Sequence, residues 1–93
     1  MFTTSPMVVV DRWTGRQAFA LQTALRLTNE TFARHLGVSV RAVAKWHALP
    51  HLVPVIELQR ALDTVLSRAG NEARQRFLLL SGSFTEADVE AAA

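Results

Sequence analysis

A chain of 93 residues, 49% of them hydrophobic, has the size of one domain with a single core. The absence of cysteine excludes disulfide bonds and thiolate metal sites. No apolar run approaches the roughly 18 residues that a membrane-spanning helix requires, and 7–10 is too short for a signal-peptide core. We therefore expect an unprocessed, soluble protein of the cytoplasm that does not bind a membrane.

Charge is distributed unevenly along the chain, although the net charge is only +2. Between Arg12 and Lys45 the chain is basic, because a single acid, Glu30, stands against Arg12, Arg16, Arg26, Arg34, Arg41 and Lys45. The C-terminus carries the opposite charge, on Glu86, Asp88 and Glu90. This asymmetry predicts a polyanionic partner for the first half, although ordinary solvated helix faces would carry similar charges.

The chain begins with a predicted arm over 1–13, followed by an amphipathic helix. Within the arm, 7–10 is a short β-type run that could form an edge strand. Thr14 can cap a helix over 15–27. The apolar positions of this helix recur on one face, at Ala18, Leu21 and Leu25.

Two shorter helices are predicted over 28–47, with a tight corner at Gly37. Glycine is about 1 kcal/mol worse than alanine inside a helix and is favoured in the left-handed position after a helix end. Thr28 and Ser39 can cap the two helices, and the small Ala33 lets them cross closely over a short turn. The side chains expected in their shared core are Phe32, Ala33, Leu36, Val38, Val43 and Trp46.

Two more helices complete an expected all-α domain of five helices over 14–80. The fourth is predicted to begin at Pro54 and to end near Gly70. Its inward positions are expected to be Val55, Leu58, Leu62 and Val65 or Leu66. Asn71 can cap the fifth helix, which reaches about Leu80. The remaining 81–93 form a tail, in which Thr85 and Asp88 approximate the capping box of a frayed helix.

Two sets of side chains are left over once these cores are assigned. On the third helix the outer set is Ser39, Val40, Arg41, Ala42 and Lys45. On the fifth helix the run Phe77, Leu78, Leu79 and Leu80 is more apolar than one buried stripe needs. That surplus predicts a partner on the fifth helix, unless the whole run closes the core.

The stretch 29–48 resembles the DNA-binding helix-turn-helix of the Xre/Cro/repressor family of bacterial and phage regulators. The positions that match are Phe32, Ala33, Leu36, Gly37, Val38, Val43 and Trp46. One helix before the motif and two after it are similar to the five-helix arrangement of that family, and VVVDRWTG and ELQRALDTVL are similar to actinobacterial members. The resemblance implies a repressor-like fold without a cofactor, and a regulator of the nucleoid that binds double-stranded DNA sequence-specifically.

The resemblance also implies which residues meet DNA. The third helix would lie in the major groove and present to the bases Ser39, Val40, Arg41, Ala42 and Lys45. Arg41 would read guanine through O6 and N7, and Val40 or Ala42 would contact a thymine methyl. The residues that would face phosphate are Asn29, Arg12, Arg16 and Arg34. By analogy, a homodimer through the fifth helix would set two reading helices about 34 Å apart.

The chain departs from the family pattern at two places. Many members end the third helix with Glu and then Gly, whereas WHALPHLVP supplies His47 and two prolines, so the phosphate contacts of that loop cannot be carried over. Arg41 and Lys45 are the only long polar side chains of the reading set, so specificity is expected to be modest or to depend partly on DNA shape.

Other functions receive less support from the residues. His47 and His51 are spaced like metal ligands, but Pro50 separates them and no acid is close, so no metal is expected. No catalytic arrangement or phosphate-binding loop is recognisable, and an enzyme is not expected. The serious alternative is a helix-turn-helix module that binds another protein, such as an antitoxin or an assembly adaptor.

Overall fold

The computed structural model describes Val10 and residues 12–81, and this part of the chain is all-α, as predicted. Its helices are α1 (Gly15–Leu25), α2 (Asn29–Leu36), α3 (Val40–Ala48), α4 (Ile56–Arg68) and α5 (Asn71–Ser81). The β-type run predicted at 7–10, apart from Val10, and the helix predicted after Thr85 lie outside the described residues. No described helix is long and apolar enough to cross a membrane.

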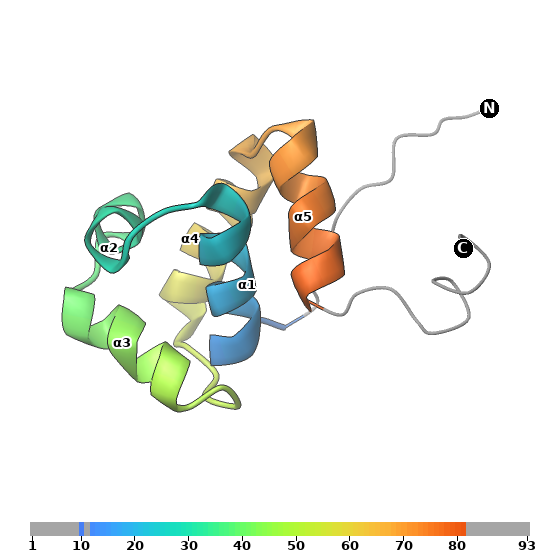
Figure 1. Ribbon diagram of the computed structural model, residues 1–93. Helices are drawn as coiled ribbons and strands as arrows, with labels where there is room; N and C mark the ends of the chain where they lie inside the picture. The colour runs from blue at the N-terminus through green and yellow to red at the C-terminus, as the bar shows by residue number, and fades with distance from the viewer. Residues whose placement is uncertain (1–9, 11, 82–93) are drawn as a thin grey trace.

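The helix α1 lies in the middle of the fold, between the α2–α3 pair and α5 (Figure 1). It packs against α3 and α5, while α2 packs against α3 and α4. The largest fully buried side chains come from before α1 and from all five helices: Trp13, Leu21, Phe32, Val43, Leu62 and Phe77. The core therefore joins α2 and α3 to the other three helices, which fixes their orientation.

The predicted helix-turn-helix corners are confirmed in detail. Thr28 and Ser39 each accept a backbone N–H bond with the side-chain hydroxyl, from Thr31 and Ala42 respectively, both at 3.1 Å. Gly37 follows α2 in the left-handed conformation, with φ of 72° and ψ of 32°. These local contacts satisfy N–H groups that a helix start otherwise leaves without partners.

Two predicted helix boundaries are wrong by two residues. α1 ends at Leu25, because Arg26 adopts the left-handed conformation with φ of 60°. α4 begins at Ile56, two residues after Pro54, so Val55 is its N-cap and is 63% exposed instead of facing inward. The first N–H groups of the helix bond to the carbonyl of Val55, from Leu58 at 3.0 Å and from Gln59 at 3.1 Å, while the carbonyl of the buried Pro54 accepts from the side chain of Gln59 at 3.0 Å.

The segment before α1 belongs to the core at its last residues, which the assignment of 1–13 to an arm missed. Trp13 is 1% exposed and packs its ring against Phe77, with centroids 5.6 Å apart. Its indole N–H donates to a carboxylate oxygen of Asp63 at 2.7 Å. Trp13 therefore ties the start of α1 to both α4 and α5.

The apolar run of α5 divides between the core and the surface. Phe77 is fully buried and Leu78 is half-buried, whereas Leu79 and Leu80 are 68% and 47% exposed. The helix begins at Asn71 itself, because the carbonyl of Gly70 accepts the N–H of Arg74 at 2.9 Å, so Asn71 is not the cap. One part of the run closes the core, and the other part is left for solvent or a partner.

Candidate nucleic-acid interface

One side of α3 is buried and the opposite side is free. Val43 and Trp46 point into the core, where the Trp46 ring meets Phe32 edge-on with centroids 6.5 Å apart. The exposed positions recur at helical spacing and form the outer face of α3: Val40, Arg41, Ala44, Lys45 and Ala48. Burial of the inner side thus holds a defined set of side chains outward.

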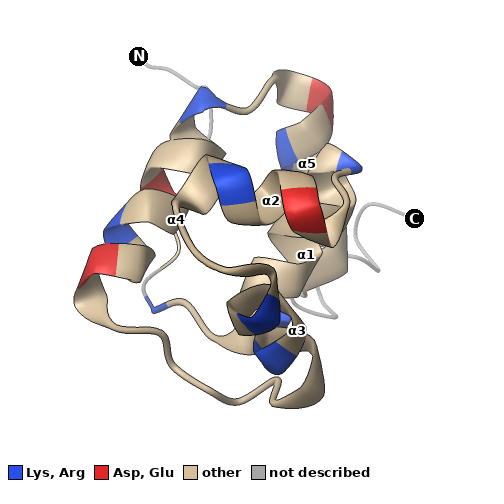
Figure 2. Cartoon of the chain, turned by 90° about the vertical axis from the view of Figure 1, so that its left-hand side faces the viewer, with Lys and Arg blue, Asp and Glu red and all other residues tan. Residues whose placement is uncertain are grey.

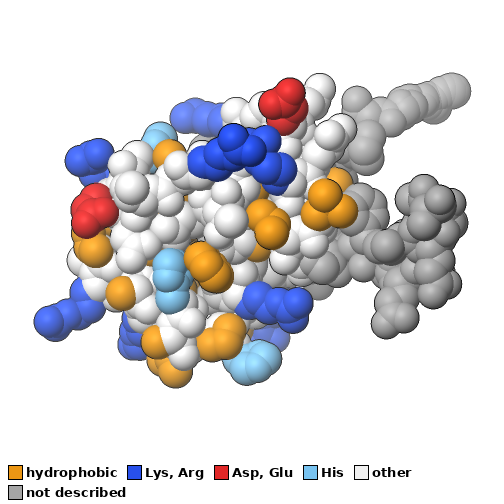
Figure 3. Space-filling model, in the orientation of Figure 1, with side chains coloured by type: hydrophobic (Ala, Val, Ile, Leu, Met, Phe, Trp, Pro, Cys, Tyr) orange, Lys and Arg blue, Asp and Glu red, His pale blue; other side chains and the backbone are white. Residues whose placement is uncertain are grey.

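The outer face of α3 is positively charged without compensation. Arg41 and Lys45 lie one helical turn apart, and within residues 12–81 neither makes a hydrogen bond or an ion pair. Between Glu30 and Glu57 the chain has no acidic residue. Figure 2 accordingly shows basic but no acidic segments on α3, and Figure 3 shows no acidic side chain over this helix.

Four of the five predicted base-reading residues, namely Ser39, Val40, Arg41 and Lys45, are exposed. Ala42 is half-buried and lies beside the outer face. The sequence reasoning missed Ala44 and Ala48, although their spacing from Val40 and Arg41 places them on the same face as those residues. Counting outward positions in steps of four and seven from Val40 and Arg41 would have found both.

The arginines predicted to contact phosphate are all exposed, but they lie at different places relative to α3. Arg34 is exposed on α2, and its guanidinium lies 3.4 Å from the hydroxyl of Thr31. Arg16 is exposed in the first turn of α1, and its backbone N–H donates to the carbonyl of Pro50 at 2.9 Å, which places it beside the α3–α4 loop. Arg12 is exposed and precedes α1. Among the described residues, no hydrogen bond or ion pair connects its side chain to α3.

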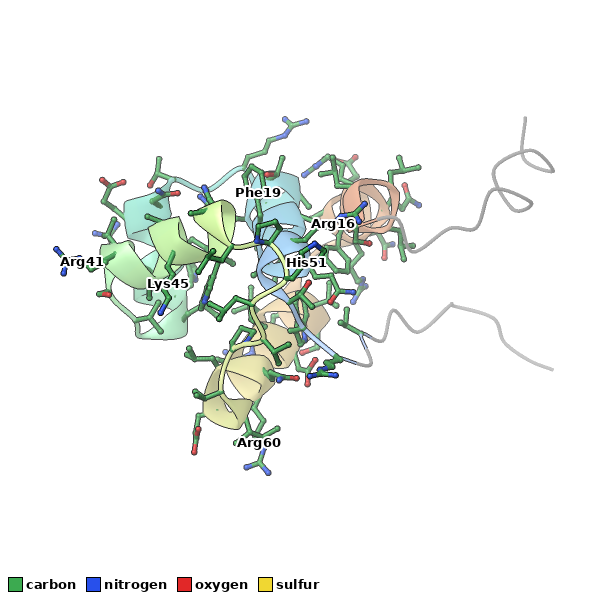
Figure 4. All side chains as sticks on the ribbon, turned by 90° about the horizontal axis from the view of Figure 1, so that it is seen from below. Arg16, Phe19, Arg41, Lys45, His51 and Arg60 are labelled. Atoms are coloured by element: carbon green, nitrogen blue, oxygen red, sulfur yellow. The ribbon has the colours of Figure 1, made fainter. Side chains whose placement is uncertain are left out.

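Figure 4 shows how the basic side chains are distributed over the lower side of the molecule. Arg41 and Lys45 extend from α3, Arg16 lies near the loop residue His51, and Phe19 lies between them on α1. Arg60 extends from α4 in a different direction. Arg41 and Lys45 therefore project from α3, Arg16 lies farther away beside the loop after α3, and Arg60 projects from α4 away from all three.

A hydrogen-bond network connects α3 to the beginning of α2. The buried Gln22 of α1 donates from Nε2 to Asn29 Oδ1 at 2.7 Å, and its Oε1 lies 2.9 Å from His47 Nε2. The His47 ring also packs against Phe19, with centroids 4.2 Å apart. His47, considered above as a metal ligand, is thus engaged in packing and hydrogen bonding. The described residues contain no cluster of three His, Cys, Asp or Glu side chains that could hold a metal ion.

The C-terminal end of α3 lies directly against the start of α1. A Cβ atom built on Gly15 would come within 2.6 Å of the carbonyl oxygens of both Trp46 and Leu49. The N–H of Gly15 donates to the carbonyl of Leu52 at 2.8 Å. Because glycine has no Cβ, the backbones can approach this closely, and the loop after α3 satisfies the first two N–H groups of α1, those of Gly15 and Arg16.

Comparison of the chain with protein-family models, with curated proteins and with solved structures finds no match in any of the three.

Proposed function

We propose that this chain is a sequence-specific, double-stranded-DNA-binding regulator of transcription of the Xre/Cro/repressor type, acting in the bacterial nucleoid. The observation that supports this proposal best is the outer face of α3, where Arg41 and Lys45 are exposed and unpaired within the described residues. A helix of this kind enters the major groove of B-DNA, which is wide enough to admit it.

The side chains of the outer face suit a short and partly apolar reading code. Arg41, in the first turn of α3, can donate two hydrogen bonds to O6 and N7 of one guanine. Val40 and Ala44 present methyl groups that suit the methyl group of thymine. Lys45, one turn further, can reach a base edge or a phosphate. Such a helix is expected to discriminate over few base pairs.

Contacts to phosphate would position α3 in the groove. Arg34 lies on α2, which packs against the start of α3, and Arg16 lies on α1, beside the loop that follows α3, so they are suited to the two walls of the groove. Their charge attracts any duplex, because phosphate contacts carry no sequence information. In this proposal α3 therefore selects the DNA sequence, and Arg34 and Arg16 supply affinity for any duplex.

A homodimer is the expected binding form. A single α3 covers only part of a site, and a symmetric pair reads two half-sites about one helical turn apart. Leu79 and Leu80 of α5 are exposed apolar side chains, and α5 lies on the other side of α1 from α3 (Figure 1). A pairing through α5 would leave both reading helices free.

The decisive experiment measures the affinity for duplex DNA selected from a random pool at several salt concentrations, with fluorescence anisotropy as the readout. Each neutralised phosphate contributes about −0.9 to the slope of log K against log salt concentration. Arg41→Ala is expected to reduce binding to the selected site by about 1–3 kcal/mol and to relax its preference, while Arg16→Ala weakens all sequences alike.

Arg60→Ala is the matched control, because Arg60 extends away from the side that carries α3. It should leave both affinity and slope close to those of the wild type. Absence of binding to any duplex at low salt would contradict the proposed function. Equal losses on selected and random DNA for Arg41→Ala would contradict its role as a base reader.

A protein-binding module is the second candidate, because exposed apolar side chains also occur away from α5. Val55 and Ile56, at the start of α4, are 63% and 57% exposed. An antitoxin or assembly adaptor would use such side chains to bind another protein. This candidate would gain support if the chain bound no DNA at low salt and Val55→Asp abolished a complex that Arg41→Ala left intact.

A further inference from the structure

Gln22 is a buried polar side chain at the junction of three helices. It is 5% exposed, and every polar group of its side chain has a partner. Nε2 donates to the carbonyl of Leu27 at 3.1 Å and to Oδ1 of Asn29 at 2.7 Å, while Oε1 lies 2.9 Å from Nε2 of His47. One residue of α1 thereby contacts the start of α2 and the end of α3.

The direction of each hydrogen bond in this network is set by one group, the backbone carbonyl of Leu27. The backbone carbonyl of Leu27 can only accept, so the amide nitrogen of Gln22 must face it. The same nitrogen must then donate to the oxygen of Asn29, and the oxygen of Gln22 must accept from a protonated Nε2 of His47. The amide group of Asn29 cannot turn over without losing the bond to Gln22.

The network leaves the side-chain NH2 group of Asn29 as a donor that faces solvent. Its Oδ1 is held by Gln22, and its Nδ2 makes no hydrogen bond among the described residues. Asn29 is half-buried and is the first residue of α2, where backbone N–H groups and the helix dipole favour an anion. If the amide were reversed, its carbonyl oxygen would face a phosphate and repel it.

We propose that Gln22 is a positioning residue for DNA binding, which fixes the Asn29 side chain with its NH2 group toward a phosphate. This inference rests on the proposed function, since it names the internal residue on which one DNA contact depends. Gln22 itself would touch no DNA. Its second bond, to His47, holds the end of α3 in the same junction, so the phosphate donor and the reading helix share one support.

The test is Gln22→Glu. A carboxylate can accept from His47, but it cannot donate to Asn29 or to the carbonyl of Leu27. Asn29 is then expected to rotate and donate to the introduced carboxylate, which turns the Asn29 oxygen outward. The variant would then lose the hydrogen bond from the Asn29 NH2 group to the phosphate. Hydrogen bonds to charged groups are worth more than neutral ones, so we expect the affinity for the selected duplex to fall about tenfold or more.

A double-mutant cycle separates this mechanism from a loss of stability. Asn29→Ala removes the phosphate donor, so Gln22→Glu should cause little further loss in the Asn29→Ala background. The slope of log K against log salt concentration should stay unchanged in Asn29→Ala, since Asn29 is neutral, whereas Arg16→Ala reduces it by about 0.9. Thermal unfolding of each variant reports any general damage.

Two further measurements keep the inference testable if Gln22→Glu does not fold. Asn29→Asp keeps the acceptor for Gln22 but presents a second, negatively charged oxygen outward, so it should weaken binding more than Asn29→Ala does. In the wild type, the side-chain NH2 resonances of Asn29 should shift when duplex DNA is added, and those of Gln22 should shift less.

The outcomes distinguish the two proposals. Failure of the wild type to bind any duplex at low salt would contradict the proposed function. Normal binding by the wild type together with equal binding by a folded Gln22→Glu variant would contradict the inference alone. Losses for Gln22→Glu that are the same with and without Asn29 would also overturn it, because the effect would not pass through Asn29. Unshifted Asn29 NH2 resonances on DNA addition would do the same.

Discussion

The close approach of α1 and α3 at Gly15 leads to a quantitative prediction for Gly15→Ala. The new Cβ would lie 2.6 Å from the carbonyl oxygens of Trp46 and Leu49, which is 0.8 Å inside the 3.4 Å where ordinary contact begins. Both obstacles are backbone atoms, so no flexible side chain can move away. The end of α3 must therefore shift relative to α1.

The magnitude follows from three contributions. Overpacking of this kind costs about 1–3 kcal/mol. The shift also strains the bonds from the N–H groups of Gly15 and Arg16 to the carbonyls of Leu52 and Pro50, each worth about 1 kcal/mol when well made. Alanine regains up to about 1 kcal/mol of helix propensity. We expect a net loss of about 2 kcal/mol, which lowers the Tm of so small a domain by roughly 8–16 °C.

The assay is thermal and urea unfolding followed by circular dichroism, with two matched glycine variants. Gly37→Ala meets no atom within 4 Å but keeps a positive φ, so it should cost only the conformational penalty of about 1 kcal/mol. Gly70→Ala meets no atom and needs no positive φ, so it should change stability by less than about 0.5 kcal/mol. A Gly15→Ala protein as stable as the wild type would refute the reasoning from backbone contact.

Three other changes test separate parts of the structure. Asp63→Ala leaves the buried indole N–H of Trp13 without its acceptor and should cost about 1–3 kcal/mol in chemical unfolding, while Asp63→Asn should cost less than about 1 kcal/mol. Leu79→Glu, at an exposed position, should convert a dimer to a monomer in sedimentation without loss of helical circular dichroism; a variant that remains a dimer would exclude α5 as the interface. Replacing thymine by uracil beside the guanine that we propose Arg41 reads should weaken binding of the wild type, and Val40→Ser should remove this sensitivity if Val40 contacts the methyl group.

The parts of the fold that the sequence predicts well are those decided within a few residues. The hydroxyls of Thr28 and Ser39 cap helices three residues away, and Gly37 adopts the left-handed conformation that glycine favours. Thr14 forms a capping box with Gln17, whose side chain returns to the N–H of Thr14 at 3.2 Å. Such contacts can be recognised from spacing alone, because both partners lie in one short segment.

Features decided across the chain could not be predicted in the same way. Trp13 has no local signal of burial, since its hydrogen-bond partner Asp63 lies 50 residues further on. Arg26 ends α1 in a conformation that is uncommon for residues other than glycine, so no residue type marked that helix end. The exposure of Val55 follows from its place as the N-cap of α4, which the apolar periodicity of 55–66 does not reveal.

The candidate site was predictable to the same limited extent. The periodicity of Val43 and Trp46 identifies the buried side of α3, so the exposure of Val40, Arg41 and Lys45 follows from it. The role that we assign to Gln22 does not follow, because glutamine in a helix is ordinarily a solvated residue. Only the positions of α2 and α3 in space reveal that it is buried between them.

These observations together show that the two ends of α3 are held by different kinds of contact. Its beginning is held locally, by the left-handed Gly37 and the cap at Ser39. Its end is held from a distance, by the glycine contact at Gly15 and by the bond between Gln22 and His47. Gly15→Ala, or a Gln22 substitution that cannot accept from His47, should therefore tilt α3 while leaving its helix intact, whereas Gln22→Glu keeps that acceptor and should leave α3 in place. In the proposed function α3 is the reading helix, so such a tilt would move Arg41 and Lys45 together, and we expect variants that remove either distant contact to weaken DNA binding although neither residue would touch DNA.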